Sequence, residues 1–167
     1  MKVEYVFSRN EKIGSKAIAW GSSLFHDHVS FLDKKIPSHV AVLLDETFVI
    51  EAVFSGGVRI IPYSEWLKHN EMLHRIEEKS VVTIDLVQEL LFEMYGKKYD
   101  WFGILYFGWS MMNHYLFGST LPKTNKWERE DYFFCTEFAA RLKSYNYAMT
   151  TPAKMCNDLL KIRKNNE

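Results

Sequence analysis

The stretch Ser38–Ala52, SHVAVLLDETFVIEA, constrains the fold of this chain more than any other segment. Two apolar runs flank a short polar stretch around Asp45, a pattern typical of an antiparallel β-hairpin. A polar side chain nevertheless stands near the open end of each strand, His39 on the first and Glu51 on the second. The sequence therefore predicts a buried hairpin that carries an imidazole and a carboxylate.

His39 and Glu51 point to the same face of this hairpin only if the loop holds an odd number of residues. We expect a loop of three or five residues centred on Asp45, which makes the two residues cross-strand partners with Cβ atoms about 5 Å apart. An imidazole and a carboxylate at that distance hydrogen-bond, which favours the charged imidazolium. The hairpin alone leaves two interpretations open, a functional pair or a solvated pair at the edge of a sheet.

Cys135 favours the functional interpretation. It opens the helical pattern CTEFAARL, after a charged run that resembles a turn. A thiol in the first turn of a helix lies at the positive end of the helix dipole, and a nearby imidazolium further favours the thiolate. The alternative is a small buried hydrophobe. We expect that role for Cys156, which lies in a late helical segment and has no separate His–acid pair to activate it.

The remaining pattern predicts one α+β domain over residues 1–167, built on an antiparallel sheet. Further strands are expected at Val3–Ser8 and Val58–Ile61, the second entered through a two-residue turn at Gly56-Gly57. A loop is expected between the first helix and Pro37. Helices are predicted at the segments with helical periodicity, which are Ile13–Phe25, Tyr63–Asn70, Thr83–Gly96, Cys135–Tyr145 and Ala153–Lys164.

A long aromatic segment covers about residues 99–130, and its part Trp101–Pro122 contains no Asp, Glu, Lys or Arg. Its length alone allows a membrane span, but glycines and polar residues dilute its apolar character. We expect a core helix, capped by Asp100, that runs into a pocket-lining or surface-docking loop. Peripheral contact with lipid through Trp101–Phe117 is the alternative.

Composition excludes several classes of function. Lys plus Arg equals Asp plus Glu, 21 each, so the basic surplus of a nucleic-acid-binding protein is missing and no such partner is expected. Two cysteines are too few for a disulfide framework, and the first twenty residues lack the apolar core of a signal peptide, so a cytoplasmic protein is expected. His26 and His28 lack evident further ligands, so no metal and no cofactor are expected.

The motifs SHVAVLL, VIEA, GVRIIPYSEWL, KKYDWFGIL and FFCTEFAARL, in this order, resemble the circularly permuted papain-like cysteine hydrolases of the NlpC-type, YiiX-like group, with lecithin retinol acyltransferase as a more distant relative. The resemblance covers roughly residues 3–160. In that group a His opens a strand, a polar residue twelve positions later orients it, and the Cys starts a helix near the C-terminus, the reverse of papain's order. Two features depart from the pattern, Lys143 in place of a usual Leu and the longer, more aromatic segment Gly108–Glu130.

The resemblance implies a permuted papain-like fold and a triad in which Cys135 is the nucleophile, His39 the base and Glu51 the group that holds the ring. It also places Tyr99 in the pocket lining, although a core tyrosine is an alternative. The implied activity is that of an amidase-like or peptidase-like hydrolase acting through a thioester. The alternatives are a lipid-directed acyltransferase or esterase on the same triad, and a binding module without turnover. The substrate would be a small molecule, a peptide or an acyl lipid.

Overall fold

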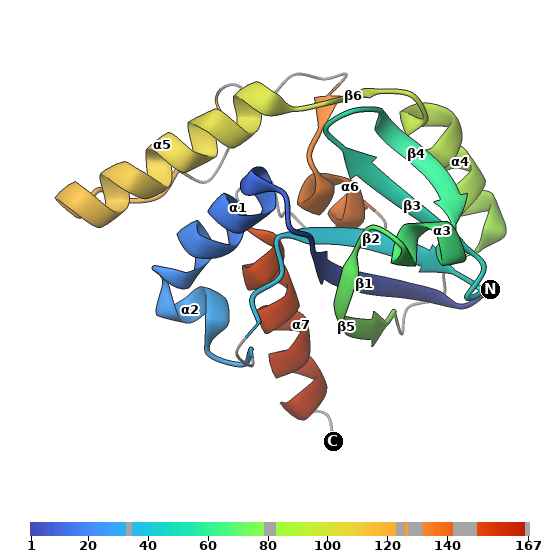
Figure 1. The fold of residues 1–167 in the computed structure, drawn as a ribbon, viewed down its shortest axis with the longest axis horizontal. Helices are drawn as coiled ribbons and strands as arrows, with labels where there is room; N and C mark the ends of the chain where they lie inside the picture. Colours follow the sequence, from blue (N-terminus) through green and yellow to red (C-terminus); the bar gives the residue numbers. More distant parts are fainter. Residues whose placement is uncertain (33–34, 79–82, 123–125, 127–131, 142–149, 166–167) are drawn as a thin grey trace.

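The protein has a mixed α+β fold around a five-stranded antiparallel sheet, seen in a computed structural model of the chain (Figure 1). The structure describes residues 1–32, 35–78, 83–122, 126, 132–141 and 150–165. The strand order is β4-β3-β2-β1-β5, and all neighbouring strands run antiparallel. These strands are β1 (Val3–Arg9), β2 (His39–Leu44), β3 (Phe48–Val53), β4 (Gly57–Pro62) and β5 (Glu71–Glu77).

Helices lie on both sides of this sheet and beyond its edge (Figure 1). They are α1 (Ile13–Ser23), α2 (His26–Val29), α3 (Tyr63–Leu67), α4 (Ile84–Met94), α5 (Trp101–Phe117), α6 (Cys135–Arg141) and α7 (Pro152–Asn165). Two short strands, β6 (Lys98–Tyr99) and β7 (Tyr132–Phe133), pair in parallel as a second small sheet. None of the helices in the described part of the chain combines the length and the apolarity that a membrane crossing requires.

Alternate residues of the central strands pack into two separate core clusters, as the period of two in a β-strand dictates. Val40 and Val42 belong to the larger cluster, which α4, α6 and α7 cover from one face of the sheet. Ala41 and Leu43 belong to the smaller cluster on the other face, where Trp66 of α3 is completely buried. The sheet is thus covered on both faces around the hairpin.

The β2–β3 hairpin has the odd loop that the sequence predicts, but its register differs by one position. The loop holds three residues, Asp45 to Thr47, and Val42 pairs with Ile50. The pairing of Leu44 with Phe48 therefore centres the turn on Glu46 rather than Asp45. Within this turn, Asp45 and Glu46 both adopt positive φ angles, of 42° and 58°. The ladder between β2 and β3 ends at the Val42–Ile50 pair, so His39 and Glu51 lie beyond it and are not the direct cross-strand partners that a turn centred on Asp45 would make them.

The β3–β4 loop corrects a second expectation. Val53 pairs with Gly57, so the loop is Phe54 to Gly56 and Gly57 is already the first residue of β4. Gly57 has a φ of 64°, and a Cβ atom at this position would lie 1.8 Å from the carbonyl oxygen of Lys97. Glycine is required because the backbone preceding β6 packs directly on it, which the hydrogen bond from Val58 N to Lys97 O, 2.9 Å long, fixes in place.

Local patterns predicted the helices better than the short strands. Thr83 caps α4 by accepting a hydrogen bond from Leu86 N, and Asp100 caps α5 in the same way. In contrast, β5 was not predicted, because it is an edge strand whose side chains are nearly all exposed or only partly buried and lack a clear alternation. The segment after Leu24 was expected to be a loop but contains the short helix α2. The predicted continuation of α6 to Tyr145 lies outside the described residues.

The expectation that Trp101–Phe117 is a core helix is wrong. The segment forms α5, which extends from the body of the protein, and many of its large apolar side chains are exposed (Figure 1). Among the α5 residues whose burial is described, Gly103, Ser110 and Met111 are buried, so small and polar side chains take much of the inner face. The apolar face predicted for α1 is exposed as well, with Ile13 and Trp20 both open to solvent.

Candidate active site

Three elements position the side chains that the sequence singles out. His39 is the first residue of β2, Glu51 lies inside the neighbouring strand β3, and Cys135 is the first residue of α6. Helix α6 packs in the larger core cluster through Cys135 and Phe138, together with Val40 of β2. The packing of α6 against β2 brings Cys135 to the end of the strand where His39 lies, although the two residues are almost a hundred positions apart in sequence.

The imidazole of His39 contacts the carboxylate of Glu51. The distance between His39 Nε2 and Glu51 Oε2 is 2.9 Å, the length of a good hydrogen bond. The Glu51 side chain is only 1 % exposed and that of His39 is 14 % exposed. This pair is not solvated, so the interpretation of an edge-strand surface pair does not hold.

Glu51 has two further partners that the sequence analysis missed. Its Oε1 accepts hydrogen bonds from Nε and Nη2 of Arg59, at 2.9 and 2.6 Å, and its Oε2 accepts one from Nε1 of Trp66 at 3.0 Å. Arg59 is the direct cross-strand partner of Glu51 on β4. The signal was present in the sequence, because Arg59 is the single charged residue in the apolar run VRII.

These contacts hold the carboxylate in one orientation. A buried carboxylate is costly unless charged and hydrogen-bonded partners compensate for lost water, and here both oxygens of Glu51 are bonded twice. Arg59 holds Oε1 through two donors while His39 and Trp66 hold Oε2, so partners on both sides of the carboxylate keep it in place. The remaining oxygen therefore faces His39 in a defined direction, and the imidazole is oriented in turn.

The thiol of Cys135 lies within hydrogen-bonding reach of His39 and also of the hydroxyl of Tyr99. Since Nε2 of the imidazole is bonded to Glu51, Nδ1 is the ring nitrogen left for the thiol. Tyr99 reaches this position because β6 pairs with β7, which places Tyr99 alongside Phe133, two residues before Cys135. Cys135 is 3 % exposed, so little of it is open to solvent.

The electrostatics favour a charged imidazole. Burial by itself lowers the pKa of His39, but hydrogen bonds to Cys135 and Glu51, and the negative charges on both, outweigh it and raise the pKa to about 10. Burial opposes ionisation of Glu51 as well, yet the hydrogen bonds and charges of His39 and Arg59 lower its pKa to about 2. The His39–Glu51 pair is therefore an imidazolium–carboxylate pair at neutral pH.

Tyr99 is held in its protonated form. Burial of its hydroxyl and the negative charge of Cys135 raise the pKa of Tyr99 well above its usual value, and the buried carboxylates of Glu137 and Asp100 act in the same direction. A neutral phenol keeps its O–H donor. Tyr99 can therefore donate a hydrogen bond at this site at any physiological pH.

Cys156 lies in the same core cluster as Cys135 but in different surroundings. It is completely buried within α7, and burial raises the pKa of its thiol. No charge or hydrogen-bond partner contributes to that shift. Its position agrees with the small buried hydrophobe expected from the sequence.

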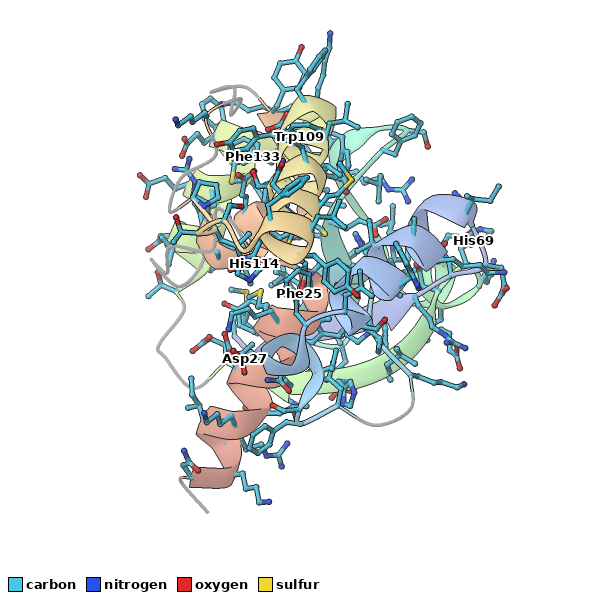
Figure 2. All side chains as sticks on the ribbon, turned by 90° about the vertical axis from the view of Figure 1, so that its left-hand side faces the viewer. Phe25, Asp27, His69, Trp109, His114 and Phe133 are labelled. Carbon is cyan, nitrogen blue, oxygen red and sulfur yellow. The ribbon has the colours of Figure 1, made fainter. Side chains whose placement is uncertain are left out.

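A pocket of about 510 Å³ lies elsewhere, where α5 meets the end of α1, α2 and α7. Figure 2 shows Phe25, Asp27 and His114 gathered beneath α5, and the ring of Phe25 stacks on that of His114 at a centroid distance of 5.7 Å. The pocket shares none of its lining residues with the His39 site. Of the HDH run, Asp27 lines this pocket; the described residues contain no group of three or more potential metal ligands.

Comparisons with known proteins found no protein-family model, no curated protein and no solved structure that matches this chain. The assignment of a function therefore depends on the geometry and electrostatics of the site.

Proposed function

We propose that this protein is a cysteine-dependent hydrolase with a Cys135–His39–Glu51 triad in a permuted papain-like arrangement. The observation that carries the proposal is that the ring of His39 lies between the thiol of Cys135 and the carboxylate of Glu51, within hydrogen-bonding reach of both. A nucleophile, a base and a group that orients the base are the three parts of such a site. The raised pKa of His39 supports an imidazolium beside the Cys135 sulfur, the form that can protonate a leaving group.

In the first half of the reaction, the Cys135 sulfur attacks a carbonyl carbon of an amide or ester and forms a C–S bond. The tetrahedral intermediate collapses to a thioester as the leaving nitrogen or oxygen takes the proton from the His39 imidazolium. In the second half, neutral His39 accepts a proton from water, and the resulting hydroxide attacks the thioester carbon. The C–S bond breaks, the acid product leaves, and the thiolate–imidazolium pair is restored.

Two groups support these steps. Tyr99 retains its proton and lies beside the Cys135 sulfur, so its hydroxyl is a donor for the oxyanion that develops next to that sulfur. Arg59 and Trp66 do not reach the reacting atoms, and act instead by holding Glu51 so that its carboxylate stabilises and orients the imidazolium. Neither a metal nor a cofactor takes part in this scheme.

The same triad supports acyl transfer if an alcohol or amine replaces water in the second half. The triad acts on the carbonyl group, which a peptide, a small amide and an acyl lipid share as acyl donors. We therefore propose the reaction class, thioester-mediated cleavage of an amide or ester, as the function.

Mass spectrometry of the intact protein tests this proposal. After incubation with p-nitrophenyl esters and peptide amides, wild-type protein and Cys156→Ala should gain the mass of one acyl group, whereas Cys135→Ala should not. Release of p-nitrophenolate reports turnover when the adduct is short-lived. A wild-type protein that shows neither adduct nor turnover, or a Cys135→Ala variant that retains both, would contradict the proposal and favour a binding module.

A further inference from the structure

One face of α5 is apolar and exposed along its whole length. Phe102, Leu105, Trp109, Met112 and Leu116 recur at intervals of three and four residues, so they form one stripe, and each is 48–58 % exposed. We call these five residues the α5 outer face. No Asp, Glu, Lys or Arg occurs anywhere in α5. Figure 2 shows Trp109 on the side of α5 away from α2 and α7.

The orientation of α5 is the reverse of that of an ordinary surface helix. A surface helix of a globular protein turns its apolar side to the core and its polar side to water. Here the buried positions include Gly103 and Ser110, while the bulky apolar side chains point outward. Exposed contiguous apolar surface of this kind marks a contact with another molecule or with lipid.

Helix α1 carries a second exposed apolar stripe. Its apolar stripe Ile13, Ala17, Trp20 and Leu24 is exposed, and the helix ends next to α5, where Phe25 stacks on His114 (Figures 1 and 2). Exposed lysines lie at the margins of the two stripes. They are Lys12 at the N-cap of α1, Lys16 on α1, which forms an ion pair with Glu11, and Lys98 of β6, three residues before α5.

We propose that the α5 outer face and the apolar stripe of α1 dock on a lipid bilayer that carries anionic headgroups. Tryptophan at the exposed positions of both helices, apolar residues between them and lysines at the margins are the composition that favours the membrane interface. Because Gly103, Ser110 and Met111 pack against the protein, only the outer side of α5 is available, so the helix lies along the surface of the bilayer.

A second copy of the chain fits this surface less well. A helix–helix seam is built mainly from Leu, Ile and Val at this same spacing, whereas the α5 outer face includes Phe102, Trp109 and Met112. A bilayer accommodates both helices at once, and anionic headgroups complement the marginal lysines.

Docking goes beyond the proposed catalytic function and does not depend on it, but the two sites adjoin. Helix α5 begins two residues after Tyr99, and Ser15 of α1 hydrogen-bonds Ser38, which precedes His39. The docked protein would therefore hold the two elements beside the triad close to the membrane.

Co-sedimentation of the full chain with vesicles tests the docking. The wild-type protein should sediment with phosphatidylcholine vesicles that contain phosphatidylserine. Without the anionic lipid, the vesicle-bound fraction should be at least about fivefold lower. Leu105→Glu and Trp109→Glu should each lower the vesicle-bound fraction at least about tenfold, because each removes apolar contact and adds a charge at the interface. Phe92→Glu is the matched control, since Phe92 on α4 is 95 % exposed and lies away from this surface.

Thermal unfolding verifies that each variant folds. Ile13→Glu on α1 provides a second test outside α5 and should also lower the vesicle-bound fraction. The same measurements made in a Cys135→Ala background should give the same binding, which separates docking from catalysis. Absence of binding to both kinds of vesicle overturns the proposal, as does an equal loss in Phe92→Glu. A wild-type dimer that Trp109→Glu converts to a monomer, without vesicle binding, would also overturn it and assign the surface to self-association.

Discussion

The two cysteines of this protein lie in one core cluster, are both nearly inaccessible to water, and have opposite chemical environments. Cys135 lies beside an imidazole and a phenol, each of which has a pKa that depends on it. Cys156 is surrounded by apolar side chains, and burial alone raises its pKa. The difference teaches that burial makes a thiol inert unless a buried cation offsets the loss of water around the thiolate.

The buried cation is available only because a second buried network supports it. His39 remains charged through Glu51, and Glu51 remains charged through His39 and Arg59. Burial alone would favour the neutral forms of His39 and Glu51, whereas the connected set keeps both charged. The contacts from Cys135 through His39 and Glu51 to Arg59 can therefore be tested in order of their distance from the thiol.

Alkylation should separate the two cysteines most strongly. In the native protein near pH 7, iodoacetamide should modify Cys135 on the order of 1,000-fold faster than Cys156, because only Cys135 has an adjacent imidazolium. Peptide mapping by mass spectrometry after timed quenching measures both rates. In concentrated urea the two rates should converge; equal and slow labelling in the folded protein would remove the distinction between the two thiols.

Glu51→Gln should lower turnover by about 10- to 1,000-fold. The amide cannot stabilise the imidazolium electrostatically, and its NH2 group must face donors on one side, either Arg59 or the pair His39 and Trp66. The same substitution at Glu77, an exposed residue of β5, is the matched control and should leave turnover unchanged. If Glu51→Gln kept the wild-type rate, Glu51 would be a structural neighbour only.

The pH dependence should report His39. Its pKa is raised from 6.5 to about 10, so the imidazolium that protonates the leaving group persists until the pH approaches 10. Because folding raises the pKa of His39, the stability that His39 contributes is complete below about pH 6.5 and is lost as the pH rises through 10. The alkaline fall of kcat/KM should lie near pH 10 in the wild type and at a lower pH in Glu51→Gln. An alkaline fall near pH 6.5 in the wild type would contradict the ion pair.

Arg59→Met should have the smallest effect, a loss of turnover of about three- to tenfold and of stability by about 1 kcal/mol, since the partly exposed guanidinium is screened by solvent. The pKa of Glu51 is lowered from 4.5 to about 2, so its contribution to stability is present above pH 4.5 and lost as the pH falls towards 2. The variant should therefore lose stability at a higher pH on acidification. Urea unfolding between pH 3 and 7 measures this, with Arg9→Met at an exposed ion pair as the control.

Local patterns were sufficient for much of the fold. Alternation of apolar residues located β1, β2, β3 and β4, and helical periodicity located α4. Edge strand β5 and the two-residue strands β6 and β7 could not be found in this way. Their hydrogen bonds are formed with distant segments, and their side chains carry no period of their own.

For the candidate site as well, local sequence patterns predicted some residues and missed others. The sequence identified His39, Glu51 and Cys135 by their residue types and by their places at a strand end, within a strand and at a helix start. It did not identify Arg59 or Trp66 as partners of Glu51, because cross-strand register and the position of α3 decide both contacts. It also placed the centre of the hairpin turn one residue too early.

The sequence by itself determined an antiparallel hairpin with a three- or five-residue loop, the parity that allows His39 and Glu51 to share a face, and a helix that begins at Cys135. Periodicity and capping are local, so residues close in sequence are enough to specify them. Only the tertiary structure decided that β6 brings Tyr99 to Cys135, that Arg59 and Trp66 hold Glu51, and that α5 presents its apolar side to solvent. An apolar stripe predicts that a helix face will be covered, but whether the protein itself covers that face depends on where every other element packs.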